Sequence, residues 1–186
     1  TYVLIVTLLI LMIGCVNDSS KLVGRSTPVY FQNLNEVIKE SFEIEDRLDG
    51  HLNNDQYIDE LYVIRYNSTG RRCLVICMGV NEDFKELYLI SSSAIQQNGE
   101  DSIESDPYIG IKIINKGFQI THKGIRCSSC ELTYTFSFNE NDRTFYLINS
   151  QALNMEIDSL QSVKKSYNRT QQEAVNLYDF DIRTEY

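Results

Sequence analysis

The chain has 186 residues, 42% of them hydrophobic and 23% charged, which is enough for one core to fold alone. Asp and Glu number 26 against 17 Lys and Arg, for a formal net charge of −9. Nucleic-acid binding needs clustered Lys and Arg, so the balance argues against a nucleic-acid partner. The negative charge either serves solubility alone or speeds the encounter with a basic protein. Twelve Tyr, eight Phe and only two Pro favour sheets over a helical bundle.

The first stretch is an uncharged apolar run, residues 2–14 (YVLIVTLLILMIG). It is shorter than the ~20 residues that span a bilayer and has the length of a secretory signal's apolar region, about 7–15 residues. The run stops at Met12-Ile13-Gly14-Cys15, and the sequence then becomes polar at once. We therefore predict that residues 1–14 are a signal peptide.

This junction resembles the bacterial lipobox, in which a small residue directly precedes a lipid-attachment cysteine. The resemblance implies cleavage after Gly14 and lipid on Cys15, whose acyl chains anchor with ~0.8 kcal/mol per buried CH2. Because Val16 rather than Asp follows the cysteine, the resemblance also implies an outer-membrane anchor facing the periplasm of the bacterial envelope. The alternative is an ordinary signal peptide or an apolar terminal helix with an incidental cysteine.

Residues 15–32 are expected to be the lipidated cysteine and a polar linker. From Asn33 the apolar residues are spaced by three and four, a pattern that predicts one short amphipathic helix with Asn33 as its cap. The apolar positions are Leu34, Val37, Ile38 and Phe42. We expect residues 33–186 to form a single β-rich domain.

Strands are expected from Asp59 onward. Continuous apolar runs at 61–64 and 73–78 predict interior strands that are covered on both faces. Alternating patterns at 108–113 and 118–121 predict an antiparallel hairpin around Asn115-Lys116-Gly117, with Gly117 available for a positive φ.

A second hairpin is predicted from the alternation at 132–138 and the apolar run at 145–148. Residues 91–107 are polar and acidic, which is typical of a long surface loop, and 177–182 are a candidate edge strand. The fold class that we expect is mainly β (α+β), an antiparallel meander sheet with one short N-terminal helix.

The acidic segment 50–61 (GHLNNDQYIDEL) resembles the GDLNxDGxxDDL element of FG-GAP-type repeats and of many small bacterial envelope lipoproteins. In those families, loop oxygen atoms and a carboxylate before the next strand can coordinate Ca2+. The resemblance places Asn53, Asp55 and Asp59 at ligand positions. His51 replaces the first Asp and Gln56 replaces the loop Gly, which favours a structural turn over an occupied calcium site.

With Cys15 assigned to lipid, the remaining cysteines are Cys73, Cys77, Cys127 and Cys130. An even number in an oxidising compartment predicts disulfides, with three conceivable pairings. Cys73 and Cys77 lie four apart on one expected strand, ~13 Å from each other, which is too far for a bridge. Either Cys127 pairs with Cys130 across a turn and leaves two buried thiols, or the pairs cross between hairpins.

Catalytic signatures are missing from the sequence. The two histidines, His51 and His122, have no nucleophile marked beside them, and no Gly-rich phosphate loop is present. We therefore expect a non-enzymatic, lipid-anchored protein-binding module with a basic protein partner, in a narrower form an immunity or inhibitor protein. The alternatives are a periplasmic thiol-redox protein using Cys127 and Cys130, or a calcium-stabilised structural lipoprotein.

Overall fold

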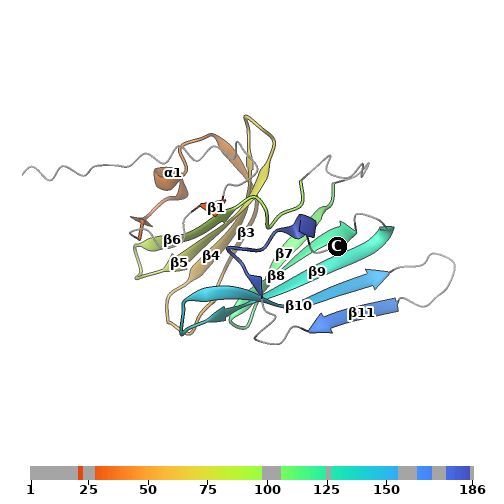
Figure 1. Cartoon of the computed structure of the whole chain (residues 1–186). Coiled ribbons are helices and arrows are strands. Elements are labelled where there is room, and N and C mark those ends of the chain that lie inside the picture. Colours follow the sequence, from red (N-terminus) through yellow and green to blue (C-terminus); the bar gives the residue numbers. More distant parts are fainter. Residues whose placement is uncertain are drawn as a thin grey trace, which may run out of the picture.

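The computed structural model describes residues 21–22, 28–97, 106–124, 127–154, 163–168 and 175–184. Side chains are described in these ranges except at 21–22, 127–129, 154 and 163–168. The predicted signal peptide and Cys15 lie outside the described residues. The chain is mainly β, as predicted, but its strands form two antiparallel sheets instead of the one meander that we expected (Figure 1).

The first sheet, called sheet A, has the strand order β1-β6-β5-β4-β3, and β2 also pairs with β6. Its strands are β1 (Lys21–Leu22), β2 (Tyr30–Phe31), β3 (Phe42–Gly50), β4 (Asp59–Tyr66), β5 (Arg72–Gly79) and β6 (Lys85–Ser91). The short strands β1 and β2 come from the segment expected to be a polar linker, and Phe31 is 2% exposed. Part of that segment therefore completes one edge of sheet A.

The second sheet, called sheet B, has the order β11-β10-β9-β8-β7, and β12 also pairs with β10. Its strands are β7 (Tyr108–Ile114), β8 (Gly117–Gly124), β9 (Cys127–Asn139), β10 (Thr144–Asn154), β11 (Val163–Asn168) and β12 (Val175–Asn176). The two predicted hairpins correspond to β7–β8 and β9–β10, which pair in antiparallel register.

The main core lies between the two sheets. Alternate residues of β8 and β9, such as Phe118 and Phe136, point inward, and their rings stack with centroids 5.0 Å apart. They pack in the same cluster as Val63 of β4 and Ile76 of β5. The period-2 alternation of sheet B is thus explained by one buried and one outer face.

Sheet A is covered on its other face by the segment that carries α1 (Leu34–Val37), a single helical turn. The Asn33 side chain caps this turn, as predicted, by accepting a hydrogen bond from the Asn35 amide at 3.0 Å. Leu34 and Ile38 pack against the outward-facing residues of β4 and β5. The continuous apolar runs of these strands are therefore buried on both faces, as predicted.

Two segments differ from the expectation. Residues 92–97 do not form a surface loop, because Ala94, Ile95 and Gln96 are each at most 1% exposed. Residues 177–182 are not an edge strand. They form a turn after β12 and then enter η2 (Ile182–Thr184), and their apolar side chains help to close the main core.

The β7–β8 turn also differs in detail. Ile114 pairs directly with Gly117, so the turn has two residues, and Lys116 rather than Gly117 adopts the positive φ, at 57°. Gly117 meets a different requirement, because a Cβ at this position would lie 2.0 Å from the Phe136 carbonyl oxygen.

Candidate binding pocket on the outer face of sheet A

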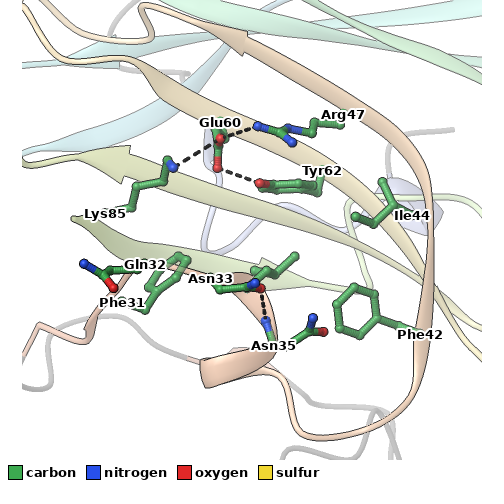
Figure 2. Close-up of a pocket in the computed structure, with 11 residues that line it drawn as sticks. Phe31, Gln32, Asn33, Asn35, Phe42, Ile44, Arg47, Glu60, Tyr62 and Lys85 are labelled. Atoms are coloured by element: carbon green, nitrogen blue, oxygen red, sulfur yellow. Dashed lines mark hydrogen bonds and ion pairs between the residues drawn. The ribbon is translucent and has the colours of Figure 1, made fainter. Parts of the chain in front are cut away.

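A cavity of about 490 Å³ opens between the outer face of sheet A and the α1 segment (Figure 2). Its lining residues come from four stretches of the chain: Phe31, Gln32, Asn33, Leu34, Asn35, Phe42, Ile44, Arg47, Glu60, Tyr62 and Lys85. Its volume lies in the range of about 300–1,000 Å³ that is usual for ligand sites.

A β-bulge in β3 builds one wall of this pocket. Ile44 pairs with Ile64, and the register then shifts so that Arg47 pairs with Tyr62. Ile44 and Arg47 therefore point to the same face although they are three residues apart, because the bulge adds one residue to the strand. Their side chains are accessible, with Ile44 51% exposed and the Arg47 side chain 53% exposed.

A buried carboxylate organises the polar part of the pocket. The Glu60 side chain is 6% exposed. Its Oε1 accepts a hydrogen bond from Arg47 Nη2 at 2.8 Å and lies 3.2 Å from Lys85 Nζ. Its Oε2 accepts a hydrogen bond from the Tyr62 hydroxyl at 2.5 Å. Figure 2 shows these groups converging from three strands. Both oxygens of Glu60 are therefore paired, as a buried charge requires.

The electrostatics of the pocket differ from those of the whole chain. Its lining contains two cations and one carboxylate, an excess of positive charge in a chain of formal charge −9. Burial and the Glu60 hydrogen bond raise the pKa of Tyr62, which keeps its hydroxyl protonated as a donor. Arg47 also contacts Asp49 at 3.3 Å, but this pair is more than half exposed and is screened by solvent.

The pocket chemistry suits binding. The described lining contains no Ser, Thr, Cys or His that could act as a nucleophile or transfer a proton. Glu60 is engaged through both oxygens and is not free to act as a general base. Apolar side chains beside a few fixed polar groups are the usual composition of a recognition site.

The side-chain oxygens of the three predicted calcium ligands all accept hydrogen bonds within the protein. Asp59 is fully buried, and its two oxygens accept from the backbone amides of Leu52 at 2.7 Å and Gly79 at 2.9 Å. The Asn53 side-chain amide donates a hydrogen bond to the Asp55 carboxylate at 2.6 Å, and both side chains also accept hydrogen bonds from backbone amides of the loop. Within the described ranges, no three His, Cys, Asp or Glu side chains form a group that could hold a metal ion. Calcium stabilisation stays a prediction, and an unchanged unfolding midpoint on adding Ca2+ would contradict it.

The predicted disulfide cysteines lie in different sheets. Cys73 and Cys77 are fully buried on β5, face the α1 segment and form no disulfide, and burial raises the pKa of the Cys77 thiol. Cys127 and Cys130 lie on β9. The register between β8 and β9 shifts at this point, because Lys123 pairs with Glu131 and Gly124 pairs with Cys127. A disulfide or redox role of Cys127 and Cys130 stays a prediction, because the Cys127 side chain lies outside the described part.

A second polar cluster joins the two sheets. The Arg72 side chain is 3% exposed and forms a two-point ion pair with Asp106 and a further one with Glu45. Its guanidinium lies 5.3 Å from the centre of the Tyr108 ring, and that ring is 5.9 Å from the ring of His122. Because every charged group here is paired, we assign a structural role to this cluster.

Sequence reasoning did not find the pocket. Its polar residues Arg47, Glu60 and Lys85 are far apart in the sequence and meet through the pairing of β3 to β6. One signal was present, because Glu60 lies directly before an apolar run that is buried on both faces. A charged residue in such a place needs a partner.

Comparison with known proteins adds no family. The chain matches no protein-family model, and it matches neither a curated protein nor a solved structure. No helix in the described part of the chain is both long and apolar enough to cross a membrane.

Proposed function

We propose that this chain is a lipid-anchored envelope lipoprotein that binds a protein partner without catalysing a reaction. The observation that carries the binding role is the open pocket on sheet A, which combines accessible apolar side chains with a fixed Glu60–Arg47–Lys85 network. Its described lining offers recognition groups and contains no Ser, Thr, Cys or His. The proposed membrane location rests on the lipobox resemblance at Met12–Cys15.

The membrane location is tested by measuring the intact mass of the expressed chain and its distribution between membrane and soluble fractions, beside a Cys15→Ala variant. We expect the mass of a diacylated or triacylated chain beginning at Cys15, and we expect the variant to leave the membrane fraction. An unlipidated wild-type chain in the soluble fraction would overturn the lipoprotein part of the proposal.

The binding role is tested by photo-crosslinking in the cells that produce the protein. A photoreactive amino acid replaces Ile44 at the pocket or, as a matched control, Ile148 on β10 of sheet B; both side chains are exposed, at 51% and 38%. We expect a discrete crosslinked protein from position 44 and none from position 148. Equal labelling from both positions, or none from position 44, would remove the pocket as the binding site.

A narrower form of the proposal is an immunity or inhibitor protein that blocks a basic toxin. The formal charge of −9 would speed capture of such a partner at low salt. The expected partner from the crosslinking experiment is then a basic protein, and its association rate should fall as salt is added. A partner with an acidic net charge would contradict this narrower form.

A further inference from the structure

We propose that the pocket on sheet A receives the carboxyl terminus of the partner protein, with the terminal carboxylate at Arg47 and Lys85 and an apolar last side chain against Phe42 and Ile44. This inference rests on the proposed function, because it names the group that the partner inserts.

The two cations are placed to share one anion. Arg47 Nη2 and Lys85 Nζ both contact the same oxygen, Glu60 Oε1, at 2.8 and 3.2 Å, so their charged ends converge on one point. Within the described residues, Arg47 Nη1 has no partner, and Lys85 Nζ contacts Glu60 alone. These remaining N–H donors are suited to a carboxylate, which can accept from several donors at once.

The charge count limits the ligand to one carboxylate. Glu60 already neutralises one of the two cations, so the lining has one positive charge in excess. The Asp49 carboxylate, which also contacts Arg47, lies outside the lining, and this more than half-exposed pair is screened by solvent. The rest of the chain is strongly acidic and repels a segment that carries many negative charges. A single carboxylate on an otherwise neutral or basic segment meets both conditions and agrees with a basic partner.

A chain terminus also fits the apolar part of the pocket. The last residue of a polypeptide carries its carboxylate and its side chain on one Cα, so both enter the cavity together. Ile44 and Arg47 offer the matching pair of surfaces on one strand, because the β3 bulge turns them to the same face. A cavity of about 490 Å³ has room for a few residues entering end-on.

The test is calorimetric titration of the full chain with the peptide acetyl-Ala-Ala-Phe, which has a free carboxylate, and with its amidated twin. We expect the amide to bind about tenfold more weakly or worse, because it loses the charge-assisted hydrogen bonds. Methyl NMR should show a shift at Ile44 and none at Ile148. Equal affinity for acid and amide would overturn the inference.

Two further probes separate other sources of the carboxylate. The amidated peptide acetyl-Ala-Glu-Phe supplies an acidic side chain, and phenylacetate supplies a free organic acid. We expect both to bind more weakly than acetyl-Ala-Ala-Phe. If either probe binds as tightly, the pocket does not select a chain terminus and the inference is wrong.

Variants test the assigned cations. Lys85→Met and Arg47→Met should each weaken the acid peptide about tenfold, whereas Lys85→Arg should keep most of its affinity. Lys112→Met removes the same charge from the exposed outer face of sheet B and should change nothing. Loss of affinity in Lys112→Met equal to that in Lys85→Met would show a general charge effect and overturn the inference.

Failure of this inference differs from failure of the proposed function. If position 44 crosslinks a partner but no peptide binds, the chain terminus is wrong and the binding role stands. If position 44 crosslinks nothing and no peptide binds, both fail.

Discussion

At the level of single residues, Asp59 ties the loop after β3 to the end of β5. Its carboxylate is fully buried and accepts from the amides of Leu52 and Gly79. Burial raises the pKa of Asp59, and the two amide hydrogen bonds oppose that shift. The residue that the FG-GAP resemblance suggested as a calcium ligand is thus committed to backbone donors on two separate segments.

Asp59→Ala should therefore destabilise the protein by about 2–4 kcal/mol, because two buried N–H groups lose their acceptors. Asp55→Asn is the matched control. Asp55 is exposed in the same loop, and the amide keeps an oxygen for the Tyr57 N–H, so a change of about 0.5 kcal/mol or less is expected. Urea unfolding of both variants measures the difference, and equal losses would contradict the assigned role of Asp59.

His122 is a second buried residue with a measurable consequence. It is fully buried on β8, and neither ring nitrogen has a hydrogen-bond partner among the described residues. Burial, reinforced by the positive charge of Arg72, lowers the pKa of His122 to about 3, although Asp106 acts in the opposite direction. The ring is therefore neutral in the folded protein at ordinary pH.

This shift predicts a loss of stability in mild acid. An unfolded His titrates near 6.5, so the unfolded state binds a proton that the folded state refuses. This difference costs almost no stability above pH 6.5. The free energy of unfolding then falls as the pH is lowered toward 3, by about 2 kcal/mol between pH 7 and pH 5. In His122→Phe the corresponding part of the pH dependence should disappear.

The measurement is urea unfolding of wild type and His122→Phe at pH 7 and pH 5. His51→Gln serves as control, because His51 is exposed in the acidic loop. The stability difference between His122→Phe and wild type should change with pH in favour of the variant. A difference that stays constant with pH would show that His122 is not the titrating group.

At the level of elements, the β7–β8 hairpin shows how a glycine can be placed for contact instead of dihedral freedom. Gly117 pairs with Ser137 on β9, and an added Cβ would lie 2.0 Å from the Phe136 carbonyl oxygen. Lys116 supplies the positive φ of the turn. The role of Gly117 is thus to let β8 approach β9.

Gly117→Ala should cost about 2–4 kcal/mol, because a backbone atom would have to move out of the sheet pairing. Gly110→Ala on β7 is the matched control, since a Cβ there meets nothing within 4 Å, and it should be neutral or stabilise by up to about 1 kcal/mol. Thermal and urea unfolding compare the two. Similar stabilities of both variants would contradict the close approach at Gly117.

The strands of sheet A differ in how well the sequence predicts them. β4 and β5 were predictable because long apolar runs with turn residues on both sides are typical of strands buried on two faces. β3 was not, because its bulge moves the outward side from even to odd positions, from Ile44 to Arg47. Its alternation is thereby broken and its sequence, FEIEDRLDG, is mostly charged. The pocket depends on this strand and was missed with it.

At the level of the whole molecule, Arg72 connects the two sheets. It starts β5 of sheet A and pairs with Glu45 in the β3 bulge and with Asp106 beside β7 of sheet B. Although burial opposes it, the hydrogen bonds from Arg72 and from the Tyr108 amide hold the pKa of Asp106 below its ordinary value. Nothing in the local sequence shows this link, because Arg72 and Asp106 are 34 residues apart.

Arg72→Met should destabilise the protein by about 2–3 kcal/mol, because Asp106 loses its two-point partner and Glu45 keeps only its ion pair with Arg65. Arg72→Lys should rescue little of this loss, since one ammonium cannot reproduce a fork that binds two carboxylates. Arg183→Met is the control, because the Arg183–Asp181 pair also forms two contacts but lies within one turn near η2, and it should cost less than about 1 kcal/mol. Urea unfolding measures all three variants.

The same network holds Glu45 at the bulge that turns Arg47 toward the pocket. Arg72→Met should therefore also weaken peptide binding at sheet A. Intact peptide binding in a destabilised Arg72→Met variant would show that the contact between the sheets does not determine the shape of the pocket.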